Sequence, residues 1–278
     1  HRTGQVVSLR SDHARLQGMV DTNGLVGARL DVTQHVLGTI MSAANDFLST
    51  VVSGTSGQVG TSVIQPSAKA TLEALTGALN TTTNGEYLFA GINTDVQPIA
   101  DYYGTPASPA RTAVADAFMA AFSVAQDSPA AANISAADMQ NFLDTAFAGL
   151  FDPAGWSGDW SSASDQNVRS RISMNELADT GVNANESAFR RLAMAATMVS
   201  DLGLANLNEG AARAIMATAS RIVGEAISEV ARLQANVGTV QAQVSRASDR
   251  MSLQIDILTN QINAQEGVDP YEAVTRVN

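Results

Sequence analysis

Two long series of apolar residues, one near each end of the chain, recur at intervals of three and four residues. This spacing places each series on one side of an α-helix, and such a seam must be buried against another helix. The N-terminal seam is Val26, Leu30, Thr33, Leu37, Ile40, Ala44, Phe47 and Val51. The C-terminal seam is Ile222, Ala226, Val230, Leu233, Val237, Val240, Val244, Ala247, Met251, Ile255, Leu258 and Ile262. The two seams predict a mainly α-helical protein whose chain ends together build an elongated coiled-coil rod.

The composition excludes several classes of function. The chain has 278 residues, 45% of them hydrophobic, which is enough for two domains. Its net charge of -11 opposes nucleic-acid binding, which depends on clustered Lys and Arg. No cysteine is present, so disulfides and thiolate metal sites are excluded. We expect no membrane insertion, because no stretch approaches the roughly 20 apolar residues that a membrane-spanning helix needs.

Catalytic and metal-binding motifs are absent from the sequence. The only histidines are His1, His13 and His35, and they lack the H-E-x-x-H spacing of zinc hydrolases. Neither a G-x-S-x-G nucleophile nor a cysteine nucleophile occurs. The chain is therefore predicted not to be an enzyme and to use no cofactor or metal.

Helical periodicity and capping residues predict the helices. Asn23-Gly24 and Gly27 are poor helix formers and predict a break before the N-terminal seam. Asn208 is a good N-cap for a long final helix. Helices are expected over residues 2–21, 26–52, 67–79, 112–124, 136–150, 186–201 and 209–263.

Turn and strand signals lie between these helices. Residues 53–60 are rich in Gly and Ser and predict a flexible turn, without the glycine spacing of a phosphate-binding loop. Asn84-Gly85 before Tyr87-Leu88-Phe89 predicts a β-hairpin over residues 84–95. Alternating apolar residues predict two short strands within residues 166–183.

A further helix is predicted to begin near the C-terminus. Asp269 at N-cap, Pro270 at N1 and Glu272 at N3 form a favourable helix start. Both carboxylates lie near the positive end of the helix dipole, so capping explains this pair better than catalysis does.

Aromatic residues gather in the middle of an aromatic-poor chain, namely Tyr102, Tyr103, Trp156 and Trp160. Buried rings would form the core of this segment, whereas exposed rings would contact a neighbouring molecule or stack on sugars. The sequence leaves all three interpretations open.

The segment Gly85-Glu86-Tyr87-Leu88-Phe89-Ala90-Gly91 resembles the N-G-x-Y-L-F-x-G motif of the flagellar hook-associated protein 3 family, the hook–filament junction proteins. The motif positions are Gly85, Tyr87, Leu88, Phe89 and Gly91. Residues 184–190 also resemble this family. Residues 269–278 are similar to the stretch where this family, and flagellin, enter their terminal helix.

The resemblance implies a flagellin-like, discontinuous rod domain formed by residues 1–97 and 184–278. A small mixed α/β outer domain would be inserted at residues 98–183. The family also has natural terminal helices, which are missing here and would lie beyond His1 and Asn278. Its members are exported by the flagellar type III apparatus and act outside the cell in the bacterial flagellum.

The implied function is an adaptor layer that joins hook to filament and on which flagellin assembles. Implied partners are further copies of the chain, the hook-side junction protein (hook-associated protein 1), flagellin and an export chaperone. We expect the free chain to be monomeric, because the terminal helices that bury most apolar surface lie outside it.

Flagellin, the filament subunit, is the nearest alternative, because it shares the coiled-coil ends. Many flagellins carry a Leu-Gln-Arg-x-Arg-Glu-Leu-Ala-like segment in the first long helix. The comparable residues 35–41 of this chain contain no arginine. A surface glycan-binding protein and a coiled-coil secretion-tip protein are the further alternatives.

Overall fold

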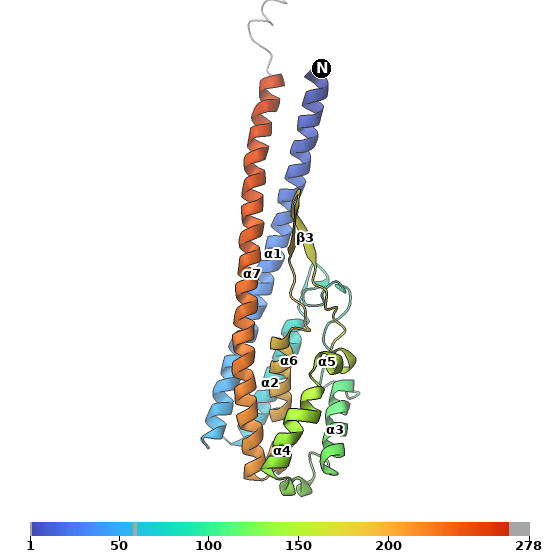
Figure 1. The fold of residues 1–278 in the computed structure, drawn as a ribbon, viewed down its shortest axis with the longest axis vertical. Coiled ribbons are helices and arrows are strands. Elements are labelled where there is room, and N and C mark those ends of the chain that lie inside the picture. Colours follow the sequence, from blue (N-terminus) through green and yellow to red (C-terminus); the bar gives the residue numbers. More distant parts are fainter. Residues whose placement is uncertain (1, 58–59, 267–278) are drawn as a thin grey trace, which may run out of the picture. The chain divides into compact units, whose positions relative to one another are not determined.

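The computed structural model describes residues 2–57 and 60–266, which are mainly helical (Figure 1). The longest helices are α1 (Arg2–Thr55) and α7 (Glu209–Glu266). The shorter α-helices are α2 (Thr61–Leu79), α3 (Pro109–Phe122), α4 (Ala136–Phe142), α5 (Pro153–Asp159) and α6 (Ser187–Asp201). Single helical turns are η1 (Pro129–Asn133), η2 (Leu143–Phe147) and η3 (Leu204–Asn206), and the strands are β1 (Thr82–Thr83), β2 (Glu86–Tyr87), β3 (Arg169–Ser173) and β4 (Glu176–Asp179). The predicted mainly α fold with long terminal helices is confirmed.

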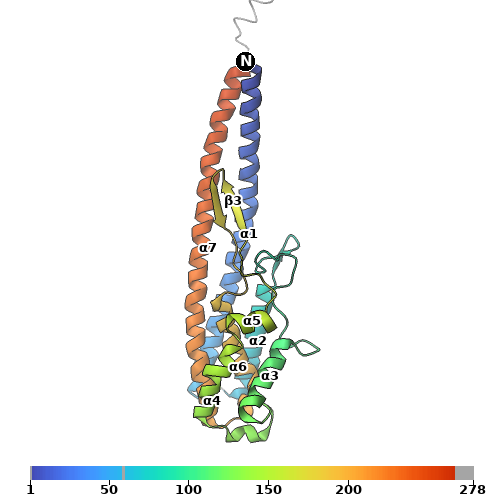
Figure 2. The same cartoon turned by 45° about the vertical axis from the view of Figure 1, so that its right-hand side comes forward.

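The described chain divides into two compact units. Unit 1 contains residues 2–31 of α1, the β3–β4 hairpin at 169–180, and residues 238–266 of α7. Within it, α1 and α7 lie side by side in both views (Figures 1 and 2). Asn23 Nδ2 donates to Ser248 Oγ at 3.1 Å, which fixes the pairing of the two helices.

The β3–β4 hairpin of unit 1 is antiparallel, and it confirms the two strands predicted in this region. Arg169 lies opposite Asp179, and Arg171 lies opposite Leu177. A bulge shifts the register between Arg171 and Ser173. The hairpin packs on the helix pair through Ile172, which is fully buried.

Unit 2 contains residues 32–168 and 181–237 and holds the larger core. Its aromatic side chains pack in a continuous row: Trp156 stacks on Trp160 at 5.1 Å, and Trp160 stacks on Tyr102 at 5.0 Å between ring centroids. These three side chains are exposed by only 1 to 3%. For these three rings the interpretation as core is confirmed, and stacking on sugars or contact with a neighbouring molecule is excluded because solvent does not reach them. The fourth ring, that of Tyr103, is only partly buried.

The two units do not follow the boundaries predicted at residues 98 and 183. Residues 98–168 lie in the same unit as α2 and α6, and residues 169–180 lie in unit 1. Residues 98–168 belong to unit 2 because they contact α6. For example, the Tyr102 hydroxyl donates to Oδ2 of Asp201, the last residue of α6, at 2.8 Å. The segment from 98 to 183 therefore forms no compact unit of its own.

Helix α1 is continuous where Asn23-Gly24 and Gly27 predicted a break. The side chain of Asn23 is 1% exposed, and its Nδ2 donates to the carbonyl of Ile172 at 2.8 Å. These tertiary hydrogen bonds compensate for the low helix propensity of Asn23.

Helix α2 begins at Thr61, six residues before the predicted start, and contains Pro66. At the other end of the connection, α1 extends to Thr55. Among the described residues of the predicted turn at 53–60, those that are not helical are Ser56, Gly57 and Gly60. Asn208 caps α7 as predicted, because its Oδ1 accepts from the backbone N–H of Ala211 at 2.9 Å.

One window within residues 4–55 of α1 is long and apolar enough, by composition, to cross a membrane, with a mean hydropathy of 1.2. This finding corrects the expectation that no stretch of the chain approaches that composition. The core helix of a soluble protein can pass the same test. Of that window, 33% is buried, while in the unit 2 part of α1 Leu37, Ile40 and Phe47 are exposed by 1% or less.

Candidate functional site

The segment that resembles the family motif begins with a tight β-hairpin. Strand β1 pairs antiparallel with β2, with Thr82 opposite Tyr87. Between the strands, Asn84 and Gly85 have φ values of 54° and 84°. A two-residue type I′ turn requires positive φ at both positions, and Asn-Gly is its favoured sequence. The predicted hairpin is confirmed, although its strands are only two residues long.

After the hairpin, the motif enters the core of unit 2. Leu88, Phe89 and Ala90 are exposed by 4% or less. The ring of Phe89 meets the ring of Phe189 in α6 edge-on, with centroids 5.9 Å apart. The carbonyl of Phe89 accepts from the N–H of Ala184 at 2.8 Å. Side-chain packing and a backbone hydrogen bond therefore join this motif to α6 and the segment before it.

Gly91 is required by both its conformation and its surroundings. Its φ is +63°, and a Cβ atom at this position would lie 2.4 Å from the carbonyl oxygen of Ser164. The next residue, Ile92, donates its N–H to the carbonyl of Gln166 at 2.9 Å. Only glycine allows the two backbone segments to approach this closely.

Asn185 forms the centre of a polar network beside the motif. Its Oδ1 accepts from Trp156 Nε1 at 3.1 Å and from Ser161 Oγ at 2.6 Å. Its Nδ2 donates to the carbonyl of Ala163 at 3.1 Å and to Asp165 Oδ1 at 2.7 Å. All the hydrogen-bonding capacity of this amide is used, which orients the loop at 161–167. The sequence marked residues 184–190 as family-like but gave no sign of this network.

Replacing Asn185 with alanine is expected to lower the free energy of unfolding by about 2–3 kcal/mol, because it leaves buried partners without hydrogen bonds. Urea unfolding followed by circular dichroism measures the loss. Asn141 is exposed on α4 and serves as the matched control, whose alanine variant should change stability by less than about 0.5 kcal/mol. Equal effects of the two variants would contradict the role of the network.

The loop after Gly91 presents apolar side chains to solvent from a fixed backbone. Ile92 is 53% exposed and Val96 is 40% exposed. The loop is held by hydrogen bonds from Val96 N–H to the carbonyl of Asn93 at 2.9 Å and from Tyr87 N–H to the carbonyl of Thr94 at 2.8 Å. The loop thus holds two exposed apolar side chains on an ordered backbone.

Two tyrosines pack between unit 2's helices with charged neighbours. The hydroxyl of Tyr103 donates to Ser200 Oγ at 2.7 Å, and the Nζ of Lys69 lies 4.7 Å from the centroid of its ring. Burial raises the pKa of Tyr103 to about 12. Burial, and then the negative charge of Asp201, raise the pKa of Tyr102 well above its usual value.

These raised pKa values predict that unit 2 loses stability at alkaline pH. The unfolded chain releases phenolic protons near pH 10, whereas the folded chain retains them, so the stabilisation present below about pH 10 declines above it. Phenolate absorbance and circular dichroism, recorded together during alkaline titration, should show Tyr102 ionising only as helix is lost. Ionisation of Tyr102 in a chain with native circular dichroism would contradict this expectation. Because the chain has four tyrosines, the difference between the parent chain and its Tyr102→Phe variant identifies the signal of Tyr102.

Most residues of the two predicted seams are buried along one side of their helices. The buried members in α1 are Leu30, Thr33, Leu37, Ile40, Ala44, Phe47 and Val51, and those in α7 are Ile222, Ala226, Val230, Val237, Val244, Ala247 and Met251. The members that are only partly buried are Val26, Leu233, Val240, Ile255, Leu258 and Ile262. Burial of the α7 seam thus ends at Met251, beyond which Leu253 and Ile257 are exposed by 64% and 56%.

The remaining predicted sites have less support from the structure. The cap formed by Asp269, Pro270 and Glu272 lies outside the described residues. His13 is partly buried and His35 is exposed, both on α1. Across residues 2–57 and 60–266, no three His, Cys, Asp or Glu side chains lie close enough to hold a metal ion.

Two models of known protein families match the sequence of this chain. The sequence model for the bacterial flagellin N-terminal helical region matches residues 1–94, and that for the bacterial flagellin C-terminal helical region matches residues 220–278. The two matches together cover more than half of the chain. The chain belongs to the flagellin-like family. Its members are structural components of the bacterial flagellum, which lies outside the cell, and flagellin domains self-assemble and are not enzymatic.

This flagellin-like chain also shares its fold with a solved structure. That structure, from Vibrio parahaemolyticus, carries the provisional description of a flagellar hook-associated protein. The TM-score is 0.64, with 9% sequence identity, over 94% of this chain and 95% of the other. At this identity the likeness shows the fold alone. No curated protein matches the chain.

Proposed function

We propose that this flagellin-like protein joins the hook of a bacterial flagellum to its filament, as an adaptor layer on which flagellin assembles. The observation that carries the proposal is the motif from Gly85 to Gly91, which resembles that of the hook–filament junction proteins. The fold shared, over almost the full length of both chains, with a protein described as hook-associated is consistent with the same function. Residues 35–41 lack the arginines that many flagellins carry there.

The proposed mechanism is geometric. Subunits that join through two different surfaces, with a rotation and rise that do not close a ring, build a helical layer. One such layer would match the hook-side junction protein below it and flagellin above it. An export chaperone would bind the unfolded chain before it leaves the cell.

Deleting the gene tests this function. The proposal predicts cells with hooks but no filaments, which release flagellin into the medium, because exported flagellin has no layer on which to assemble. Expression of the gene from a plasmid should restore the filaments. Filaments that persist in the deletion strain would contradict the proposal, and absence of any exported filament protein would identify the chain as the flagellin itself.

The free chain is expected to be monomeric at micromolar concentration, with a mass of 28.9 kDa. Like charges oppose association, because unit 2 carries seven Lys and Arg against seventeen Asp and Glu. Sedimentation equilibrium measures the mass directly. A dimer with a dissociation constant in the micromolar range would count against the expectation.

A further inference from the structure

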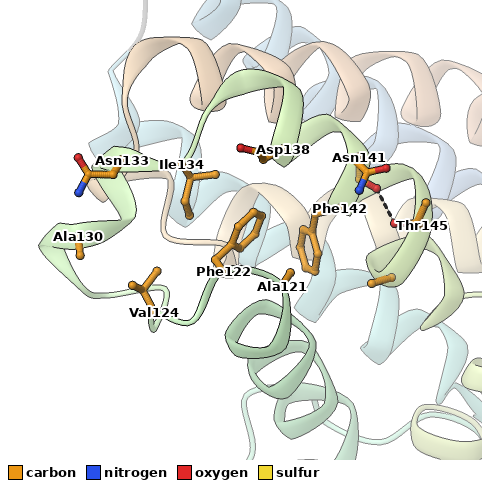
Figure 3. A pocket seen from close by; sticks show the side chains of 11 residues that line it. Ala121, Phe122, Val124, Ala130, Asn133, Ile134, Asp138, Asn141, Phe142 and Thr145 are labelled. Carbon is orange, nitrogen blue, oxygen red and sulfur yellow. Dashed lines mark hydrogen bonds between the residues drawn. The ribbon is translucent and has the colours of Figure 1, made fainter.

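An open groove lies at the end of α3 in unit 2. Its volume is about 710 Å³, and it is lined by residues from the end of α3, from η1 and from α4 with η2. Figure 3 shows Phe122 and Phe142 facing one another at its centre, and their ring centroids are 5.1 Å apart. Ile134 lines one side, and Asn141 lines the other. Phe142 and Ile134 are already buried, at 2% and 7% exposed, so half-buried Phe122 and Val124 form the apolar part of the lining that a further side chain could cover.

The rim of the groove is polar and partly acidic. Its residues include Asp138 and Asn141 beside exposed alanines such as Ala121 and Ala146, which are too small to cover this apolar part of the lining. The surrounding segment is also acidic, since residues 112–168 contain seven aspartates and no Lys, Arg or Glu. An occupant that combines apolar side chains with a positive charge would complement this groove.

The β3–β4 hairpin of unit 1 presents such a surface. Met174 at its turn is 40% exposed, and Leu177 is 49% exposed. Arg171 pairs with Leu177 across the strands, and its Nη1 donates to the carbonyl of Met174 at 2.9 Å. Ile172 and Ala178 are buried, whereas Arg171, Met174 and Leu177 are exposed. The hairpin also carries Arg169, Glu176 and Asp179, so its own charges sum to zero.

The distribution of charge favours contact between the two different units of separate copies. Over its described residues, unit 1 carries eight Lys and Arg against eight Asp and Glu, whereas unit 2 carries seven against seventeen. Two copies of unit 2 would therefore repel one another, and unit 1 would meet unit 2 with little repulsion.

We propose that the groove lined by Phe122, Phe142 and Asp138 receives the β3–β4 hairpin tip of a second copy of this chain. Met174 and Leu177 would cover Phe122 and Val124, and the methionine sulfur would make a favourable contact with the ring of Phe122. Arg171 would face Asp138 at the rim. Because groove and hairpin are different surfaces, the contact is heterologous and can continue from subunit to subunit. The inference rests on the self-assembly of the proposed function and not on its place in the flagellum.

Cysteine cross-linking between two copies tests the contact, since the chain has no cysteine of its own. Full chain with Ala146→Cys at the groove is mixed with full chain carrying Asn175→Cys, which is exposed beside Met174 at the hairpin tip, and a mild oxidant is added. The proposal predicts heterodimers that form at least about fivefold faster than in a control mixture in which Ala231→Cys, exposed on α7, replaces the hairpin cysteine. Equal rates in the two mixtures would overturn it.

Charge exchange makes the test specific. Asn141→Arg places a positive charge in the groove and should lower the rate of cross-linking about fivefold. Ala137 is exposed on the same helix but does not line the groove, so Ala137→Arg should leave the rate unchanged. Adding Arg171→Glu to the hairpin copy should restore the rate against the Asn141→Arg groove. Circular dichroism checks that each variant is folded. Equal slowing by both arginine variants, or no restoration, would overturn the inference, while the location of the protein on flagella would be unaffected.

Discussion

Gly91→Ala is expected to lower the free energy of unfolding of unit 2 by about 3 kcal/mol. About half of this loss comes from forcing alanine into a positive φ, and the remainder from the collision of its Cβ with backbone that cannot move freely. The φ of Gly91 is +63°, and the alanine Cβ would lie 2.4 Å from the carbonyl oxygen of Ser164 and 2.6 Å from that of Gln166. Urea unfolding followed by circular dichroism gives the loss.

Alanine variants of two other glycines separate the cost of the positive φ from the cost of the Cβ collision. Gly85 has a φ of +84° with open space where a Cβ would lie, so Gly85→Ala should cost only about 1 kcal/mol. Gly77 in α2 has neither a positive φ nor a neighbour within 4 Å, so Gly77→Ala should stabilise the chain by about 0.5–1 kcal/mol. Equal losses at Gly85 and Gly91 would show that the carbonyls of Ser164 and Gln166 do not constrain the motif.

Phe89→Ala is expected to lower the free energy of unfolding by about 3–5 kcal/mol, because it removes a fully buried aromatic ring and leaves a cavity. The variant also removes the edge-on contact with Phe189, while the backbone hydrogen bond to Ala184 can persist. Phe89→Leu keeps part of the volume and should cost about half as much. The midpoint of urea unfolding, at unchanged slope, measures both changes.

Ile92, three residues further along, is the matched control for Phe89. It is 53% exposed, so Ile92→Ala should change stability by less than about 0.5 kcal/mol. Comparable losses for Phe89→Ala and Ile92→Ala would mean that the motif does not anchor the core of unit 2.

The sequence was sufficient to predict features that depend on local periodicity and capping. The seams place Leu37, Ile40 and Phe47 on one face of α1, and all three are buried. Asn208 caps α7, and Asn84-Gly85 forms the hairpin turn, because each of these signals acts on neighbouring backbone alone. Periodicity predicts which face of a helix is apolar, but it does not predict whether another segment covers that face. Beyond Met251, for example, Leu253 and Ile257 of α7 are exposed.

Features that depend on contacts between distant segments could not be predicted in this way. Asn23-Gly24 predicted a break in α1, yet the Asn23 amide is buried and donates to the carbonyl of Ile172 in a bulged strand. The network around Asn185 joins residues more than twenty positions apart, and the groove at Phe122 and Phe142 joins α3 to α4. No short sequence pattern marks either arrangement, and the same dependence explains why residues 98–168 join α6 rather than form a separate unit.

Immunogold labelling of this protein on intact flagella tests the proposed function most directly. An antibody against the full chain, viewed by electron microscopy, reports where the subunits lie. The account predicts a narrow band of label where the hook meets the filament, and a deletion strain should show none. Label along the whole filament would contradict the junction role and identify the chain as a flagellin.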